Sequence, residues 1–236
     1  MRLVLLHHAG GSRLLYRGWE RWLPASWQVV ALDFPGRGRR SDRAPVRDID
    51  AIAEHVLDEA LTGLDGPLAL FGHSMGAAVA AHVTNRLVHG AGQMPAWLGV
   101  SGWDARRPDS FDGMSDAELH ERLIALGGTP PALLTDPDHW RLLAPVLSAD
   151  LAVVASGDPG AGGGWLQVPL SLFGGRGDVV AGPQRMAELA ARARRLVGLH
   201  LHDGGHFYLT ERPGAVARQI AADVAAATTP PHRRTA

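Results

Sequence analysis

The sequence predicts an α/β fold in which a mostly parallel sheet is flanked by helices. Two observations support this prediction: short apolar segments alternate with longer segments of helical periodicity, and glycine, proline or polar residues bound each apolar segment. The length of 236 residues, against about 150 for a typical domain, predicts one large domain or one domain with a subdomain. With 46% hydrophobic and 20% charged residues, the composition is that of a globular protein.

Six short apolar segments are predicted to be buried parallel strands, because polar residues hardly interrupt them. They are 3–6, 29–32, 68–71, 97–100, 170–173 and 197–201. Between the second and third strands, apolar residues recur at helical spacing from Ile49 to Leu64, and Asp48 is in place as the N-cap. Further helices are expected at 77–87, 184–193 and 213–226. This alternation predicts a doubly wound sheet.

The segment from 104 to 164 interrupts the alternation. Ser115 to Glu118 has the pattern of a capping box, and Pro137 suits a first helical position. Five glycines between 156 and 164 predict a flexible return to the sheet. We therefore expect a core formed by 1–103 and 165–227, a helical lid with its glycine-rich return at 104–164, and a disordered tail at 228–236.

The composition excludes several kinds of chemistry. The absence of cysteine excludes disulfides, thiolate zinc sites, iron–sulfur clusters and a cysteine nucleophile. All 23 basic residues are arginine, which excludes Schiff-base and P-loop lysine chemistry. The net charge of −1 gives no general attraction for nucleic acid, and no segment suits a signal peptide or a membrane span. We expect a cytoplasmic monomer without a metal, cofactor, nucleic-acid or membrane partner.

The residues Gly72-His73-Ser74-Met75-Gly76 follow a predicted strand and precede an alanine-rich helix. In this context G-x-S-x-G is the nucleophile-elbow pattern: the serine occupies a strained strand-to-helix turn, where side chains at both glycine positions would clash. The amide dipoles of the helix point at Ser74. We therefore predict that Ser74 is a nucleophile, and the alternative is a glycine-rich packing turn with an idle serine.

A serine nucleophile needs a histidine base, which in turn needs a carboxylate to orient it. In hydrolases with this elbow the chain order is serine, acid, histidine, and each residue lies on a loop after a strand. Asp178 and His206 follow the last two predicted strands and fit this order. Asp203 and Asp104 are the alternative acids.

An oxyanion that develops on a substrate needs two backbone donors. One is expected from Met75, the residue after the nucleophile. The other is expected from Ala9 in the loop after the first strand, where Gly10-Gly11 leaves the backbone accessible. The alternative for Gly10-Gly11 is a simple turn.

Four further histidines flank predicted strands. His7 and His8 end the first strand, where they are expected to line the site. His200 and His202 share one face of the last strand. They are either packing residues or a metal pair, and no third ligand with suitable spacing is visible in the sequence.

Several motifs beyond the elbow resemble those of a known family. They are Ala9-Gly10-Gly11-Ser12, Tyr16-Arg17-Gly18-Trp19, Pro35-Gly36-Arg37-Gly38, Leu126-Gly127-Gly128-Thr129-Pro130, Pro145-Val146-Leu147, Gly174-Gly175 with Asp178, and Gly205-His206-Phe207-Tyr208-Leu209. Over nearly its whole length the chain resembles the type II (external) thioesterases of polyketide and nonribosomal peptide pathways, in the α/β-hydrolase superfamily. It is similar also to the medium-chain thioesterase that acts with fatty acid synthase.

The resemblance implies an α/β-hydrolase fold and hydrolysis of acyl or aminoacyl thioesters on the phosphopantetheine arms of acyl and peptidyl carrier proteins. Such enzymes clear stalled or misprimed chains. It implies Ser74, Asp178 and His206 as the triad, and the amides of Met75 and Ala9 as oxyanion donors. An oxygen-ester hydrolase or an acyltransferase on the same fold is the alternative, and a non-catalytic binding protein is a more distant one.

The chain also departs from the family. The residues before Ala9 are commonly a proline and an aromatic residue in the family, whereas this chain has His7 and His8. Arginines gather from Arg37 to Arg47, where five of them stand against a single aspartate. Because carrier proteins are generally acidic, Arg37, Arg39 and Arg40 are expected to help dock the carrier, and the alternative is a solvated loop.

Overall fold

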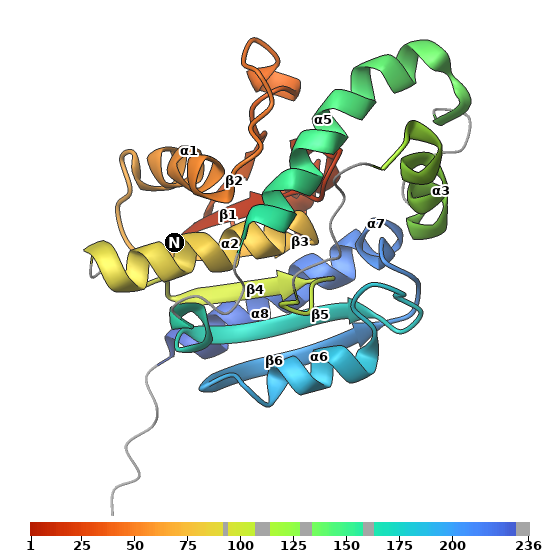
Figure 1. Cartoon of the computed structure of the whole chain (residues 1–236). Coiled ribbons are helices and arrows are strands. Elements are labelled where there is room, and N and C mark those ends of the chain that lie inside the picture. Colours follow the sequence, from red (N-terminus) through yellow and green to blue (C-terminus); the bar gives the residue numbers. More distant parts are fainter. Residues whose placement is uncertain (92–93, 107–113, 128–133, 158–162, 230–236) are drawn as a thin grey trace, which may run out of the picture.

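A computed structural model of the chain describes residues 1–91, 94–106, 114–127, 134–157 and 163–229. In these residues six strands form one sheet in the order β2-β1-β3-β4-β5-β6, and every neighbouring pair is parallel (Figure 1). The strands are β1 (Arg2–Leu6), β2 (Gln28–Leu32), β3 (Leu68–His73), β4 (Trp97–Ser101), β5 (Pro169–Gly175) and β6 (Arg195–His202). The predicted parallel sheet is confirmed, and each strand is one to three residues longer than its apolar segment.

The described helices are α1 (Ile49–Leu61), α2 (Met75–Arg86), α3 (Asp116–Leu126), α5 (Pro137–Ser156), α6 (Pro183–Ala190), α7 (Tyr208–Glu211) and α8 (Pro213–Thr228). Three of the helices, α1, α3 and α5, begin at the cap or first-turn residues that the sequence predicts. The Asp48 side chain accepts hydrogen bonds from the amides of Asp50 and Ala51 at the start of α1. Ser115 and Glu118 form the predicted capping box of α3. Pro137 occupies the first turn of α5, as expected.

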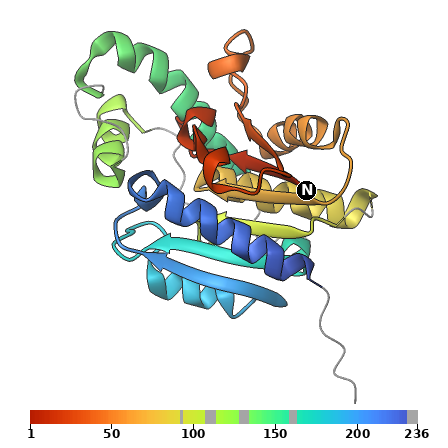
Figure 2. The same cartoon turned by 180° about the vertical axis from the view of Figure 1, so that it is seen from behind.

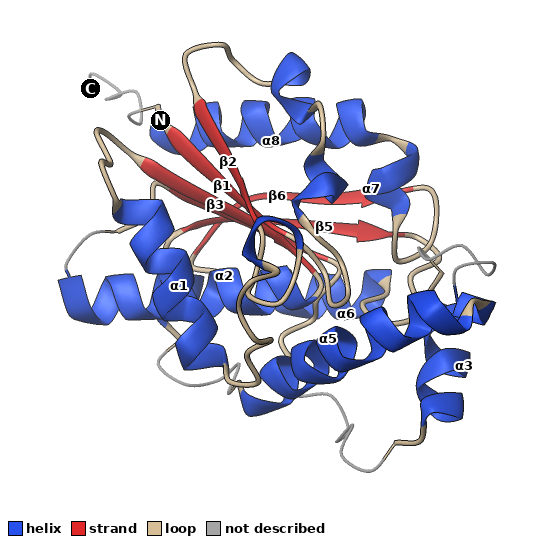
Figure 3. Ribbon diagram, turned by 90° about the horizontal axis from the view of Figure 1, so that it is seen from above, coloured by secondary structure: helices blue, strands red, loops and turns tan. Residues whose placement is uncertain are grey.

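Two hydrophobic cores lie on the two faces of the sheet. On one face, side chains such as Leu70 and Val100 pack against α1, α2 and α6. On the other face, Phe71 and Phe173 pack against α8 and the buried rings of aromatic residues that include Trp19. Figure 2 shows α8 lying across this second face, and Figure 3 shows the sheet between α8 and the layer of α1, α2 and α6. Helices on both faces are what a doubly wound sheet requires.

The insertion between β4 and β5 contributes α3 and α5, which lie on the same side of the sheet as α1 and α2 (Figure 3). Helix α5 packs over the loop after β1, because Leu143 and Leu147 lie against Gly10. That this insertion acts as a lid stays a prediction. The expected glycine-rich return falls partly outside the described residues, and Ser156 still belongs to α5.

Of the predicted tail at 228–236, Thr228 still belongs to α8, and residues 230–236 lie outside the described part of the chain. Among the described residues, no helix combines the length and apolarity that crossing a bilayer requires.

Candidate active site

Ser74 occupies a strained turn between β3 and α2. Its backbone has φ 56° and ψ −117°, a left-handed φ that non-glycine residues rarely adopt. The turn is held by a hydrogen bond of 2.7 Å from the Ser74 amide to the carbonyl of Ser101. The hydroxyl of Ser74 makes no capping hydrogen bond to α2. The strain therefore presents the hydroxyl at the tip of the turn, as a nucleophile elbow does.

The two glycines of the elbow are required by the close approach of neighbouring backbone. A Cβ atom at Gly72 would collide with the carbonyl of Gly76, and one at Gly76 would collide with the carbonyl of Leu6. Leu6 is the last residue of β1 and pairs in register with Gly72. The elbow and the loop after β1 are therefore in direct contact.

His206 and Asp178 lie on the loops after β6 and β5. Nδ1 of His206 is 2.9 Å from Oδ2 of Asp178, and both side chains are buried. The other carboxylate oxygen accepts hydrogen bonds from the amides of Val180 at 2.8 Å and Ala181 at 3.2 Å. The contact between Nδ1 of His206 and Asp178 orients the His206 ring, so that Nε2 is the nitrogen left to exchange a proton with a nucleophile.

The carboxylate of Asp178 stays ionised. Burial alone would raise the pKa of Asp178, but the hydrogen bond and charge of His206 and the two backbone amides outweigh burial and hold this pKa below its usual value. An ionised Asp178 can stabilise an imidazolium at His206.

The alternative acids have other partners. Asp203 is exposed and pairs with Arg176 at 3.5 Å and Arg212 at 3.8 Å. Asp104 pairs with Arg106 at 3.0 Å and Arg185 at 3.5 Å. The contact with His206 distinguishes Asp178 from both.

Two further histidines surround His206. His73 lies with its ring centroid 4.9 Å from that of His206, and His8 packs edge-on against Phe207 at 4.7 Å. Nδ1 of His73 is 2.8 Å from the hydroxyl of Ser101. The sequence predicts His8 at the site but no role for His73, although the position of His73 inside the elbow motif is a signal that could have revealed it.

Both neighbouring rings are neutral at neutral pH. Burial, together with the charge of His206, holds the pKa of His73 well below its ordinary value. Burial and the charges of His206 and Arg37 lower the pKa of His8 to about 3. Protonation of either ring beside His206 is therefore unfavourable.

The predicted oxyanion donors lie on the two sides of the contact between the elbow and the loop after β1. Met75 is the first residue of α2, where a backbone amide has no partner within the helix. Ala9 is half-buried in the loop that follows β1. Its neighbour Gly10 donates its amide to Oδ2 of Asp150 at 2.7 Å, so that amide is already occupied.

The structure corrects the prediction for Arg37. Its side chain is buried and pairs with the buried carboxylate of Asp150 on α5, with a hydrogen bond of 2.7 Å from Nη2 to Oδ1. A guanidinium that is buried and neutralised is not available to dock a carrier protein. Arg39 is exposed, and Arg40 forms an ion pair with Glu59 on α1.

His200 and His202 do not share a ligand. Nε2 of His200 is 2.7 Å from Oδ2 of Asp223, whereas His202 stacks on Tyr208 with ring centroids 5.0 Å apart. In the part of the chain that the structure describes, no three histidine or carboxylate side chains are grouped as metal ligands would be.

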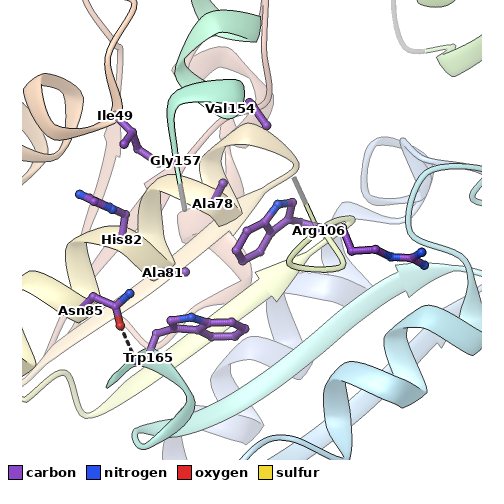
Figure 4. Close-up of a pocket in the computed structure, with 10 residues that line it drawn as sticks. Ile49, Ala78, Ala81, His82, Asn85, Arg106, Val154, Gly157 and Trp165 are labelled. Carbon is purple, nitrogen blue, oxygen red and sulfur yellow. Dashed lines mark hydrogen bonds between the residues drawn. The ribbon is translucent and has the colours of Figure 1, made fainter. Parts of the chain in front are cut away.

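A pocket lined by two tryptophans lies beside α2, one turn beyond the elbow (Figure 4). The rings of Trp103 and Trp165 lie 5.7 Å apart, and the amide of Trp165 donates to Asn85 at 2.8 Å. The space open to the centre of a water molecule is about 10 Å³, so the pocket has room for about one water. A larger hollow of about 600 Å³ lies between α3 and α5 and is lined by Leu119, Trp140 and Arg47 among others.

Comparison with known proteins places the chain in a family, because the family model described as "Thioesterase domain" matches residues 1–224. The chain belongs to the thioesterase family. This thioesterase is 27% identical to the gramicidin S biosynthesis protein GrsT of Aneurinibacillus migulanus, over 89% of the chain and 84% of GrsT. It is 30% identical to phenyloxazoline synthase MbtB of Mycobacterium tuberculosis over 94% of the chain, but spans only 16% of MbtB.

Solved structures agree with this assignment. The thioesterase is similar to YbtT, a type II thioesterase from the yersiniabactin NRPS/PKS pathway, with a TM-score of 0.81 and 28% identity over 97% of the chain and 94% of YbtT. An esterase and an enol-lactonase below 20% identity share the fold as well, which confirms the predicted α/β-hydrolase fold. The predicted family is thus confirmed, whereas the roles of the individual site residues stay predictions.

Proposed function

We propose that this thioesterase hydrolyses acyl or aminoacyl thioesters from the phosphopantetheine arms of carrier proteins in polyketide and nonribosomal peptide synthesis, and clears stalled or misprimed chains. The observation that supports the chemistry best is the 2.9 Å contact between His206 and the ionised Asp178, beside a strained turn that presents Ser74. The description of YbtT as a type II thioesterase of an NRPS/PKS pathway supports the substrate class.

In the proposed reaction, the Ser74 hydroxyl attacks the thioester carbonyl while Nε2 of His206 takes its proton. The amides of Met75 and Ala9 stabilise the oxyanion, and the pantetheine thiol leaves. A thiol with a pKa of about 8.5 needs little acid assistance to leave, so hydrolysis of the acyl-enzyme by water is the slower half. His206 activates that water.

Intact-mass measurement on a panel of acyl-loaded carrier proteins tests this proposal. The wild type should release the acyl group, and Ser74→Ala should lower kcat on the order of 10⁴-fold or more. Ser26→Ala, at an exposed serine in the turn before β2, is the matched control and should behave like the wild type. Wild-type hydrolysis by Ser74→Ala would remove the serine from the mechanism. Faster turnover of matched oxygen esters than of thioesters would favour an oxygen-ester hydrolase.

Carrier docking is proposed for two other arginines of the arginine-rich loop, the exposed Arg39 and the partly exposed Arg40, which pairs with Glu59. Charge reversal at both positions should raise KM for an acyl-carrier substrate and leave KM for a small acyl-pantetheine unchanged, because only the carrier has an acidic surface. Arg192→Glu is the matched control, since Arg192 is exposed just before β6, at the opposite edge of the sheet. Equal changes for both substrates would contradict docking at this loop.

A further inference from the structure

His7 directly follows β1, is fully buried, and packs its ring against Phe34 at 4.4 Å. Its Nδ1 is 2.8 Å from the carbonyl oxygen of His8, and its Nε2 is 3.4 Å from the amide nitrogen of Phe34. A backbone amide can only donate, so Nε2 is the acceptor and the ring hydrogen is on Nδ1. His7 therefore donates a hydrogen bond to the carbonyl of His8.

This hydrogen bond determines where the amide of Ala9 points. The carbonyl of His8 accepts a second hydrogen bond, from the amide of Gly11 at 3.1 Å. The carbonyl of His8 and the amide of Ala9 belong to one peptide unit, and in a trans peptide they point in opposite directions. Two donors on that carbonyl thus orient the amide that we propose as an oxyanion donor.

The next peptide unit, between Ala9 and Gly10, is held by Asp150. The amide of Gly10 donates to Asp150, and Arg37 neutralises that carboxylate within the protein. Gly10 has φ +72°, and the side chains of Leu143 and Leu147 lie against it, so α5 closes over this glycine. Two successive peptide units of the loop are therefore fixed by two buried side chains that come from different parts of the chain.

Stability alone does not explain these polar groups. A buried ion pair is often replaceable by apolar residues without loss of stability, and burying a histidine carries a desolvation penalty. An aliphatic or carbocyclic aromatic side chain at position 7 would fill the space without supplying the Nδ1 donor. Burial and the charge of Arg37 lower the pKa of His7 well below its ordinary value, so the ring stays neutral and keeps Nε2 as an acceptor.

We propose that His7 and Asp150 are positioning residues that hold the loop of residues 8–11 so that the amide of Ala9 faces the developing oxyanion. This inference rests on the proposed function, because it takes Ala9 as an oxyanion donor. Loss of either anchor, His7 or Asp150, lets the loop turn away. The enzyme then stabilises the transition state less, while its binding of the substrate changes little.

The first test compares His7→Phe with His7→Asn. Phenylalanine fills the space without a donor, whereas the side-chain amide of asparagine can donate from near the place of Nδ1. With an acyl-pantetheine substrate, His7→Phe should lower kcat about 10-fold or more and change KM less than about 2-fold, which is a smaller loss than removing a donor outright. His7→Asn should recover most of kcat.

The second readout is a transition-state analogue. A trifluoromethyl ketone analogue of the acyl-pantetheine forms a tetrahedral adduct whose oxyanion needs the same donors. Its inhibition constant should rise in His7→Phe by the factor by which kcat/KM falls. Wild-type kcat and inhibition constant in a folded His7→Phe protein would overturn the inference. If His7→Asn lost as much kcat as His7→Phe, packing and not the hydrogen bond would explain the loss, and the inference would also be overturned.

The third test addresses the other anchor. The double variant Arg37→Met/Asp150→Leu removes both charges together, so that neither remains buried without a partner. Its kcat should fall about 10-fold or more at nearly unchanged KM. Asp223→Asn is the control, because Asp223 is a buried, hydrogen-bonded carboxylate on α8 across the sheet, and it should keep the wild-type kcat. Wild-type kcat in the folded double variant would overturn the role of Asp150.

These outcomes separate the inference from the proposed function. If the wild type does not hydrolyse acyl thioesters, or if Ser74→Ala hydrolyses them as well as the wild type, the proposed function fails. If the wild type is active, Ser74→Ala is not, and the anchor variants match the wild type, only the present inference fails.

Discussion

The ring of His73 lies 4.9 Å from the ring of His206 and is anchored by the hydroxyl of Ser101, which in turn lies 2.7 Å from the hydroxyl of Tyr208. A neutral ring is thus fixed against the proposed base. Because His73 precedes Ser74 directly, the elbow itself supplies one wall of the space in which His206 lies.

The ring of His8, which is packed against Phe207, makes folding stability depend on pH. The pKa of His8 is about 3 in the folded protein, against about 6.5 in an unfolded chain. Between these pH values the unfolded state binds one more proton than the folded state, so stability falls as pH falls, by about 1.4 kcal/mol per pH unit for this ring. Urea unfolding at pH 7.5 and 5.5 measures this loss. His8→Phe should show a smaller loss than the wild type, and an equal loss would contradict the prediction.

Asp178→Asn should lower kcat on the order of 10³-fold or more at little cost in KM. An amide at this position cannot stabilise an imidazolium and favours the wrong tautomer of His206. Asp203→Asn is the matched control and should stay within about 2-fold of the wild type, since Asp203 is exposed and pairs with two surface arginines. Steady-state hydrolysis of an acyl-pantetheine compares the two, and a larger loss in Asp203→Asn would assign the acid differently.

Arg37→Met should destabilise the protein by about 3–5 kcal/mol, because it leaves the buried Asp150 carboxylate without its charge partner. Arg40→Met removes the partner of Glu59, but that pair is partly exposed and should contribute less than about 1 kcal/mol. The free energies of unfolding in urea make the comparison. Similar values for both variants would show that the Arg37 pair is not a buried anchor.

Gly76→Ala should destabilise the protein by about 3 kcal/mol or more, because the new methyl group meets the backbone carbonyl of Leu6, which cannot move without shifting β1. Gly90→Ala adds the same methyl group where, among the described residues beyond its own helix, no atom lies within 4 Å of the added carbon, and is the control. In thermal unfolding, the midpoint temperature of Gly76→Ala should lie clearly below that of Gly90→Ala. A stable Gly76→Ala protein with wild-type activity would be inconsistent with the tight elbow.

The sequence predicts most of this fold because the signals are local. Buried parallel strands are apolar runs, and the caps at Asp48 and Ser115 are set by the next three residues, so both appear without knowledge of the fold. The order of Ser74, Asp178 and His206 along the chain is also visible, although their catalytic roles remain predictions.

Contacts over long separations could not be predicted in the same way. Arg37 stands in a run of arginines that suggests a charged surface, and its burial depends on Asp150, which is 113 residues away. The amide of Phe34, in the loop after β2, donates to Nε2 of His7 and so leaves Nδ1 as the donor of this ring. Such pairings become visible only when the strand order is known, because no local pattern distinguishes a buried arginine from a solvated one.

The position of Asp150 within α5 divides that helix into two parts with different freedom. The C-terminal part, which contains Asp150 and Val153, is fastened to the body of the protein, whereas Leu142 near the other end has 76% of its surface exposed. Pro145 lies between them and cannot donate the hydrogen bond that would stiffen the helix at that point. If this helix swings to admit a long tethered substrate, the bend falls near Pro145, and the swinging arm is the amino-terminal half together with α3.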